Sequence, residues 1–190
     1  MANLSLNYKH ISSAVDEALT YIDKRRKGEV SSLKTSKKKL NAALLNGVEW
    51  GRIFTIAGLS GSGKSLICEE LKRDFCELNP DEDFDILSFE FEMLAKDQVT
   101  RNLSGRTGKS TKYLYSGQEN VLTDEEFQGV QQVAKDLVGY PIYYVDNVGT
   151  VDQIEATILN FVMEQELAQN NRGLVVTIDH ILLTRGKLGV

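Results

Sequence analysis

Residues 52–70 read RIFTIAGLSGSGKSLICEE, and this stretch decides the fold of the chain. Its first part, 53–57, is a nearly continuous apolar run, which is typical of a strand buried on both faces. Residues 58–65 (GLSGSGKS) match the pattern G-x-x-x-x-G-K followed by Ser or Thr at every fixed position. From Leu66 onward the sequence favours a helix. A strand, a glycine-rich loop and a helix in this order predict a phosphate-binding loop.

Each residue type in this loop has a physical task in holding Mg²⁺-ATP. Glycines let the backbone curl until several N–H groups point at a phosphate, and the helix N-terminus adds partial positive charge. Lys64 supplies a full charge toward the β- and γ-phosphates, and the Ser65 hydroxyl can ligate Mg²⁺. A chance match by an ordinary turn is expected in only about one chain in a hundred of this length. The expected nucleotide contacts are Gly58, Ser60, Gly61, Ser62, Gly63, Lys64, Ser65 and Leu66.

Length and composition place the chain among globular proteins of one domain. It has 190 residues, of which 42% are hydrophobic, and a domain of this size buries about 70% of its unfolded surface. No apolar run is long enough for a membrane span, and the N-terminus lacks the apolar core of a signal peptide. Cys68 and Cys76 are too far apart along one expected helix to form a disulfide. We therefore expect free thiols and a cytoplasmic location.

The net charge of −5 hides an asymmetry along the chain. Residues 1–40 carry nine Lys and Arg against four Asp and Glu, which gives +5. Residues 41–190 carry thirteen against twenty-three, which gives −10. Because an acidic body binds nucleic acid poorly without specific contacts, composition alone does not argue for DNA binding.

An amphipathic helix is expected ahead of the nucleotide-binding body. Apolar residues repeat at helical spacing between Ile11 and Ile22. A capping box of Ser13 with Asp16 is expected at its start, and the basic run before Gly28 suits its end. The apolar stripe either folds back on its own domain or docks on a neighbouring subunit. We predict a linker helix and basic connector over 1–39 and the ATPase domain over 40–190.

Helices and strands alternate after the loop, which predicts an α/β fold with a mainly parallel sheet flanked by helices. Capping boxes begin two of the helices, at Thr123 and at Thr150. The region 104–117 is expected to be irregular, although 105–110 (GRTGKS) superficially resembles a second phosphate loop. The expected strands are 84–93, 142–146 and 174–179. The residues expected to face inward from the helices are Ile67, Leu71, Phe75 and Leu78, then Phe127, Val130, Ala134 and Leu137, then Ile154, Ile158, Phe161 and Val162.

Carboxylates near the ends of the strands 84–93 and 174–179 are the candidates for catalysis and metal binding. Alternation along 84–93 puts Phe89 and Phe91 on one face and Glu90 and Glu92 on the other. Hydrolysis needs a group that orients or deprotonates water, and Glu92 is the first choice for it. Glu90 is the alternative, or else the partner of a buried cation; spacing alone does not decide. Asp179 ends an apolar strand, where it suits Mg²⁺ binding opposite the loop serine.

These pieces resemble, in order, the ATPase domain of the DnaB-type replicative DNA helicases, a branch of the RecA-like ATPases. The resemblance covers about residues 10–190. Its most telling parts are the Glu-Met at 92–93, at the end of the expected strand 84–93, and the Asp-Asn at 146–147, at the end of the expected strand 142–146. The matching segments are the linker helix, 58–65, 91–93 (FEM), 122–127 (LTDEEF), 141–147 (PIYYVDN) and 179–183 (DHILL).

The resemblance implies an ATP-dependent helicase that unwinds duplex DNA as a hexameric ring. Lys64 and Glu92 then have catalytic roles, and Ser65 and Asp179 hold Mg²⁺. Arg101 is expected to be structural or interfacial. Implied partners are single-stranded DNA, other copies of the chain and a primase or helicase loader, with no membrane. The alternative is a RecA- or KaiC-like ATPase that serves recombination or switching. A small P-loop kinase is disfavoured because 104–117 lacks an arginine-rich lid.

The chain departs from the family pattern in two ways. His180 stands where the family usually has Tyr. Family members also continue further, with a strand that carries a γ-phosphate sensor, DNA-contacting loops and an arginine finger. We therefore expect a truncated helicase that binds nucleotide and hydrolyses it weakly. Because the sensor strand normally lies between the phosphate-loop strand and the Asp179 strand, 53–57 and 174–178 are not expected to pair.

Overall fold

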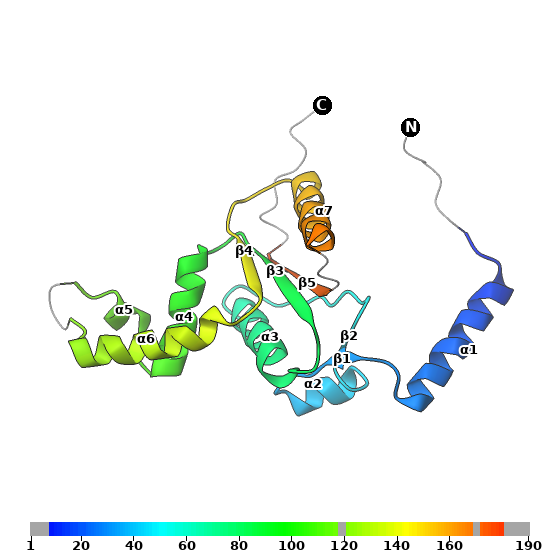
Figure 1. The fold of residues 1–190 in the computed structure, drawn as a ribbon, viewed down its shortest axis with the longest axis horizontal. Helices are drawn as coiled ribbons and strands as arrows, with labels where there is room; N and C mark the ends of the chain where they lie inside the picture. The colour runs from blue at the N-terminus through cyan, green and yellow to red at the C-terminus, as the bar shows by residue number, and fades with distance from the viewer. Residues whose placement is uncertain (1–7, 118–120, 169–171, 181–190) are drawn as a thin grey trace. The chain divides into compact units, whose positions relative to one another are not determined.

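A computed structural model describes residues 8–117, 121–168 and 172–180 (Figure 1). The chain divides after Ile56 into two compact units, and each is described by itself. Within the three described ranges, no helix combines the length and the apolarity needed to cross a bilayer.

In the first unit, residues 8–56 form two helices and a short antiparallel pair of strands. Ser32 pairs with Glu49 and Leu33 pairs with Val48. Gly47, just before β2, has a φ of 127°, and a Cβ there would lie 2.4 Å from the carbonyl oxygen of Leu33. Glycine is therefore required where the second strand enters the pair. The elements are α1 (Ile11–Lys27), β1 (Ser32–Leu33), α2 (Lys38–Ala43) and β2 (Val48–Glu49).

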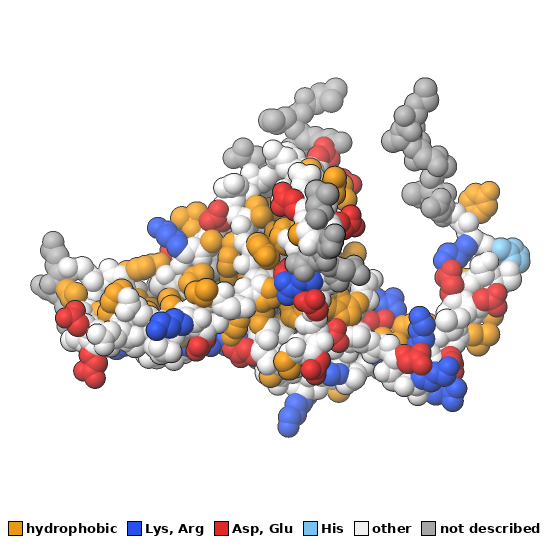
Figure 2. All heavy atoms as spheres, in the orientation of Figure 1, with side chains coloured by type: hydrophobic (Ala, Val, Ile, Leu, Met, Phe, Trp, Pro, Cys, Tyr) orange, Lys and Arg blue, Asp and Glu red, His pale blue; other side chains and the backbone are white. Residues whose placement is uncertain are grey.

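The start of α1 is capped by a residue other than the one predicted, whereas its end is as predicted. His10 is the N-cap, and its ring accepts a hydrogen bond from the Ser12 N–H at 3.2 Å. The predicted capping box of Ser13 and Asp16 is wrong, because the helix has already begun before Ser13. Gly28, in the left-handed conformation, ends the helix as expected. Lys and Arg side chains gather at this end, where they complement the helix dipole (Figure 2).

The apolar stripe of α1 is not covered by the first unit. Leu19 is 61% exposed, and Ile11, Val15 and Ile22 are exposed as well. Instead, a polar side chain of α1 contacts the rest of the first unit: Tyr21 Oη donates a hydrogen bond to Glu49 Oε2 at 2.7 Å. The stripe is left available for its own ATPase body or for a neighbour.

The second unit is built on a parallel sheet in the order β4-β3-β5 (Figure 1). All seven residues of β3, the central strand, are buried. The predicted α/β architecture with parallel strands is confirmed. The elements are α3 (Lys64–Leu78), β3 (Phe84–Glu90), α4 (Ala95–Thr107), α5 (Thr111–Leu114), α6 (Asp124–Val138), β4 (Ile142–Val145), α7 (Val151–Leu167) and β5 (Gly173–Asp179).

The two faces of β3 meet different helices. Leu87, Phe89 and Phe91 form the core with Ile154, and Ile158 and Phe161 of α7 pack against it. On the other face, Ser88 and Glu90 accept hydrogen bonds from Lys72 of α3. The predicted alternation along this strand is therefore confirmed, with an apolar face toward α7 and a polar face toward α3.

Two predicted helix starts are confirmed, and one predicted loop is wrong. Thr123 with Glu126 and Thr150 with Gln153 form complete capping boxes at α6 and α7. The region 104–117 is not irregular, because α4 runs to Thr107 and α5 follows it. The GRTGKS segment is divided between the end of α4 and the N-cap of α5, so it is not a second phosphate loop.

The predicted strand 53–57 does not form, and the segment has no regular secondary structure. Ile53 is 96% exposed. A strand takes its hydrogen bonds from a neighbour, and in the described ranges only β3 flanks β5. Neither described sheet pairs 53–57 with 174–178.

Three residues predicted to face inward are exposed. Ile67 and Leu78 on α3 are partly open, and Phe127 on α6 is 51% exposed, whereas Phe75 and Val130 are buried as expected. On α3 the reason is electrostatic. Lys72 of this helix faces the sheet, because it forms ion pairs with Glu90 of β3 and with Glu69.

Candidate functional site

The glycine-rich loop leads into a helix, as its sequence predicts, and its glycines adopt conformations that other residues rarely take. The loop of residues 58–63 leads directly into α3, and Lys64, Ser65 and Leu66 form the first turn of that helix. Gly61 and Gly63 have φ values of 76° and 87°, which L-residues rarely adopt. At Gly58 a Cβ would lie 2.6 Å from Ser62 Oγ, so the loop closes on itself most easily with glycine there.

Lys64 folds back over the loop. Its ammonium donates to the carbonyl oxygens of Gly58 at 3.1 Å and Leu59 at 3.0 Å. The charge is therefore held beside the start of α3, where backbone N–H groups of the first turn have no helical partner. Positive charge, exposed N–H groups and a serine hydroxyl in the same turn fit a phosphate group with Mg²⁺.

The two predicted carboxylates follow adjacent parallel strands. Glu90 is in register with Asp179, and the Phe91 N–H donates to the Asp179 carbonyl at 2.9 Å. Glu92 therefore comes directly after the point where β3 and β5 end together. Glu92 is exposed, whereas Asp179 is only 8% exposed. Parallel strands collect ligand-binding groups at this edge.

The described residues contain no cluster of three or more His, Cys, Asp or Glu that would hold a metal by itself. Ser65 and Asp179 stay the predicted Mg²⁺ ligands; Mg²⁺ commonly takes one or two such groups from a protein together with substrate phosphates.

A buried lysine beneath this edge was missed by the sequence reading. Lys72 is 1% exposed, and its Nζ lies 2.6 Å from Glu90 Oε1 and 2.8 Å from Ser88 Oγ. It also forms an ion pair with Glu69, and its Nζ lies 5.2 Å from the centre of the Tyr144 ring. Burial disfavours the ammonium, but attraction to Glu69 and Glu90 outweighs it and raises the pKa of Lys72.

The surroundings of Lys72 are acidic as well as buried. Burial raises the pKa of Glu69, Lys72 opposes this, and the carboxylates of Glu90 and Asp179 reinforce it. Burial also raises the pKa of Cys68 to about 12, so this thiol stays protonated at neutral pH. Cys76 is likewise a free thiol.

Glu90 is the partner of a buried cation, which is one of the roles that the sequence left open. Its second oxygen, Oε2, accepts a hydrogen bond from Gln98 Nε2 of α4 at 2.7 Å. Periodicity could not find Lys72 or Gln98, because a polar residue inside a helix pattern is ordinarily read as solvent-facing. Glu92 stays the predicted hydrolytic residue. Arg101 is exposed, and His180 is partly buried.

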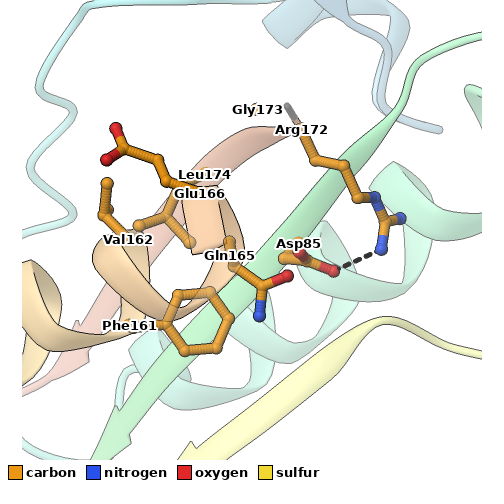
Figure 3. Close-up of a pocket in the computed structure, with 8 residues that line it drawn as sticks. All are labelled: Asp85, Phe161, Val162, Gln165, Glu166, Arg172, Gly173 and Leu174. Atoms are coloured by element: carbon orange, nitrogen blue, oxygen red, sulfur yellow. Dashed lines mark hydrogen bonds and ion pairs between the residues drawn. The ribbon is translucent and has the colours of Figure 1, made fainter. Parts of the chain in front are cut away.

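A small pocket lies at the opposite end of the sheet and does not belong to this site (Figure 3). It measures about 110 Å³ and is lined in part by Phe161 and Leu174. Arg172 Nη1 pairs with Asp85 Oδ1 across its mouth at 2.6 Å. A pocket of this size at the start of β3 and β5 is too small for a nucleotide.

A comparison with known protein families supports a nucleotide-binding site at the glycine-rich loop. The family model described as "DnaB-like helicase C terminal domain" matches residues 32–188. The chain belongs to this family. No curated protein sequence matches the chain significantly.

A solved structure described as an "ATPase Domain" has the same fold. The two superpose with a TM-score of 0.68 at 13% sequence identity. The match covers 90% of this chain and 58% of that one, so the chain spans less than two thirds of the length of its structural relative. At this identity the likeness concerns the fold alone.

Proposed function

We propose that this chain acts as the ATP-binding and ATP-hydrolysing motor domain of a replicative DNA helicase. The observation that carries the proposal is the placement of a complete phosphate loop at the start of α3, in a member of the DnaB-like family. Glu92 and Asp179, at the ends of adjacent strands, add a carboxylate that can orient water and a carboxylate that can hold Mg²⁺.

The proposed roles follow from the chemistry of each side chain. Bound Mg²⁺-ATP supplies the phosphoryl group and the metal charge. The loop N–H groups and the Lys64 ammonium bind phosphate oxygens, while Ser65 and Asp179 hold the metal. The exposed Glu92 carboxylate orients the attacking water and accepts its proton.

We also propose how the protein assembles and which partners it binds. The exposed apolar stripe of α1 supports docking on a neighbouring copy, and a hexameric ring is the arrangement that we propose. Such a ring would bind single-stranded DNA in cytoplasmic DNA replication, together with a primase or a helicase loader.

Two substitutions test the proposal by separating binding from hydrolysis. Lys64→Ala removes a charge-assisted contact and should weaken Mg²⁺-ATP binding by about 10- to 100-fold. Glu92→Gln should leave binding unchanged and lower the hydrolysis rate by about 10²- to 10⁴-fold. Calorimetry measures the first, and phosphate release measures the second.

Glu125→Gln is the matched control, because Glu125 is an exposed carboxylate on α6, outside the site. Binding that survives Lys64→Ala, or hydrolysis that survives Glu92→Gln, would contradict the proposed roles.

A further inference from the structure

Glu90 is a buried carboxylate with both oxygens engaged. Its Oε1 accepts from Lys72 Nζ and from Ser88 Oγ, each at 2.6 Å, and its Oε2 accepts from Gln98 Nε2 at 2.7 Å. The three donors come from α3, β3 and α4. Because Glu90 is buried and both of its oxygens accept hydrogen bonds within the protein, it is not placed to act on substrate itself. It joins three elements at one point.

The turn that carries Glu92 lies between Glu90 and Gln98, whose side chains are hydrogen-bonded to each other. Residues 91–94 connect β3 to α4, and the bond from Gln98 to Glu90 spans the whole turn. Two further bonds fix its ends: the Phe91 N–H donates to the Asp179 carbonyl at 2.9 Å, and the Ala95 N–H donates to Asp146 Oδ2 at 3.1 Å. Glu92 itself is exposed, so its position depends on these anchors.

Lys72 extends the connection to the phosphate loop. It lies seven residues after Ser65 on α3, which is two helical turns and therefore the same face. Its ammonium is completely enclosed by Glu69, Glu90, Ser88 and the Tyr144 ring. The helix that begins at the phosphate loop is thus tied, through one buried charge, to the turn that carries Glu92.

We propose that the network of Lys72, Glu90 and Gln98 positions Glu92 for hydrolysis, with Gln98 as the positioning residue that fixes α4 to β3. The inference rests on the proposed ATPase function and adds the residues that set its geometry. Catalytic groups must be held to within about 0.5 Å, and a misplacement of about 1 Å costs about 10²-fold in rate.

Gln98→Met in the full chain is the direct test, because methionine keeps the length of the side chain and lacks the N–H donor. We expect kcat for ATP to fall by about 10- to 100-fold while KM and Mg²⁺-ATP binding stay unchanged. Hydrogen exchange of the amides in 91–95 should become faster. A role in stability alone would not give this division between kcat and KM.

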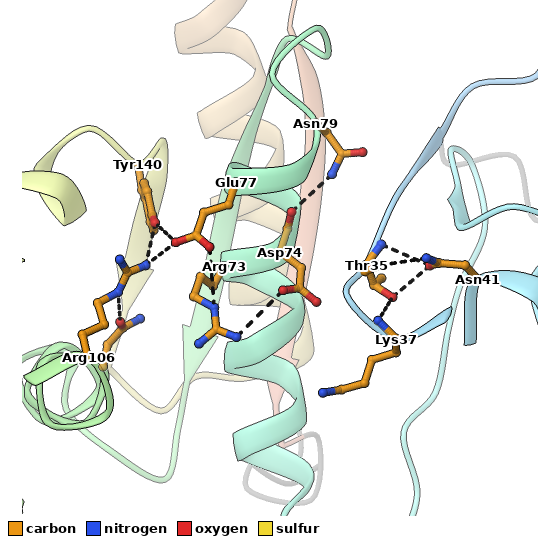
Figure 4. Close-up of polar contacts among 10 residues, drawn as sticks. Thr35, Lys37, Asn41, Arg73, Asp74, Glu77, Asn79, Arg106 and Tyr140 are labelled. Carbon is orange, nitrogen blue, oxygen red and sulfur yellow. Dashed lines mark hydrogen bonds and ion pairs between the residues drawn. The ribbon is translucent and has the colours of Figure 1, made fainter. Parts of the chain in front are cut away.

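Arg106→Met is the matched control on the same helix. Arg106 lies in the last turn of α4, at the end away from the turn 91–94. It bonds to Asn102 Oδ1 at 3.0 Å and to Tyr140 Oη at 2.6 Å, and it pairs with Glu77 of α3 (Figure 4). This substitution should loosen the end of α4 without changing kcat or exchange in 91–95. The double variant Lys72→Met with Glu90→Gln removes both charges of the Lys72–Glu90 ion pair, and it should lower kcat as Gln98→Met does.

The outcomes separate the two proposals. A wild-type chain that does not bind Mg²⁺-ATP overturns the proposed function. A wild-type chain that hydrolyses ATP with kcat unaltered by Gln98→Met overturns the positioning role alone, as does an equal loss of kcat in Arg106→Met. Unchanged exchange in 91–95 also overturns it, however slowly this chain turns over.

Discussion

At the scale of single residues, the environment of each carboxylate in the candidate site depends on whether it is paired with a buried cation. Glu90 and Glu92 are two residues apart on the same face of the expected strand, and their spacing alone does not choose between them. Glu90 is buried against Lys72, whereas Glu92 is exposed in the turn that follows β3. Burial beside a cation gives Glu90 a structural environment, whereas the exposed Glu92 remains available for the hydrolytic role that we propose for it.

Removing Lys72 alone should therefore be costly. Lys72→Met leaves Glu69 and Glu90 without their common counter-ion, and breaking a buried pair in this way costs about 3–5 kcal/mol of the free energy of unfolding. Adding Glu90→Gln should recover much of that loss. Urea denaturation of the two variants and of the wild type measures the difference, and equal stability of all three would contradict a buried ion pair.

At the scale of elements, local capping sets the helix boundaries. The first turn of α6 is an example, because Glu126 closes the capping box with Thr123 and also contacts Lys109 and Tyr113. The hydrogen bond from Lys109, then that from the Thr123 N–H, then that from Tyr113 lower the pKa of Glu126 to about 2.

This pKa predicts a pH dependence with a definite sign. Since the folded-state pKa lies below the ordinary value of 4.5, the contacts of Glu126 stabilise α6 fully above about pH 4.5. The stabilisation is lost as the pH falls toward 2. Amide exchange in the first turn of α6 should rise over this window, and in Glu126→Gln the rise should be absent.

Glu125→Gln is the control for that measurement, because Glu125 is an exposed carboxylate in the same turn. Loss of the pH response in Glu125→Gln, or its persistence in Glu126→Gln, would contradict the assignment.

At the scale of the whole molecule, α1 offers an apolar stripe that its own unit leaves open. If the stripe docks on a neighbouring copy, Leu19→Ser should reduce self-association, as measured by sedimentation velocity. Because Leu19 is exposed, the free energy of unfolding should change by less than about 0.5 kcal/mol. Asp16→Ser, at an exposed position outside the stripe, is the control. Association that is unaffected by Leu19→Ser would favour the alternative in which the stripe folds back on its own domain.

The sequence by itself determined the phosphate loop, the parallel α/β alternation and the capping boxes at Thr123 and Thr150. All of these depend on residues near one another in the chain, where glycine geometry, strand alternation and side-chain caps act locally. It also placed Glu92 and Asp179 at strand ends, because parallel strands finish at one edge.

Only the tertiary structure decided the rest. It left 53–57 unpaired, because a strand exists only beside a partner. It made the polar Lys72 and Gln98 the anchors of Glu90, because their partners lie 18 and 8 residues away in sequence and meet only across packed elements. A buried charge is stable only where its counter-charge is brought to it, and that arrangement cannot be read along the chain.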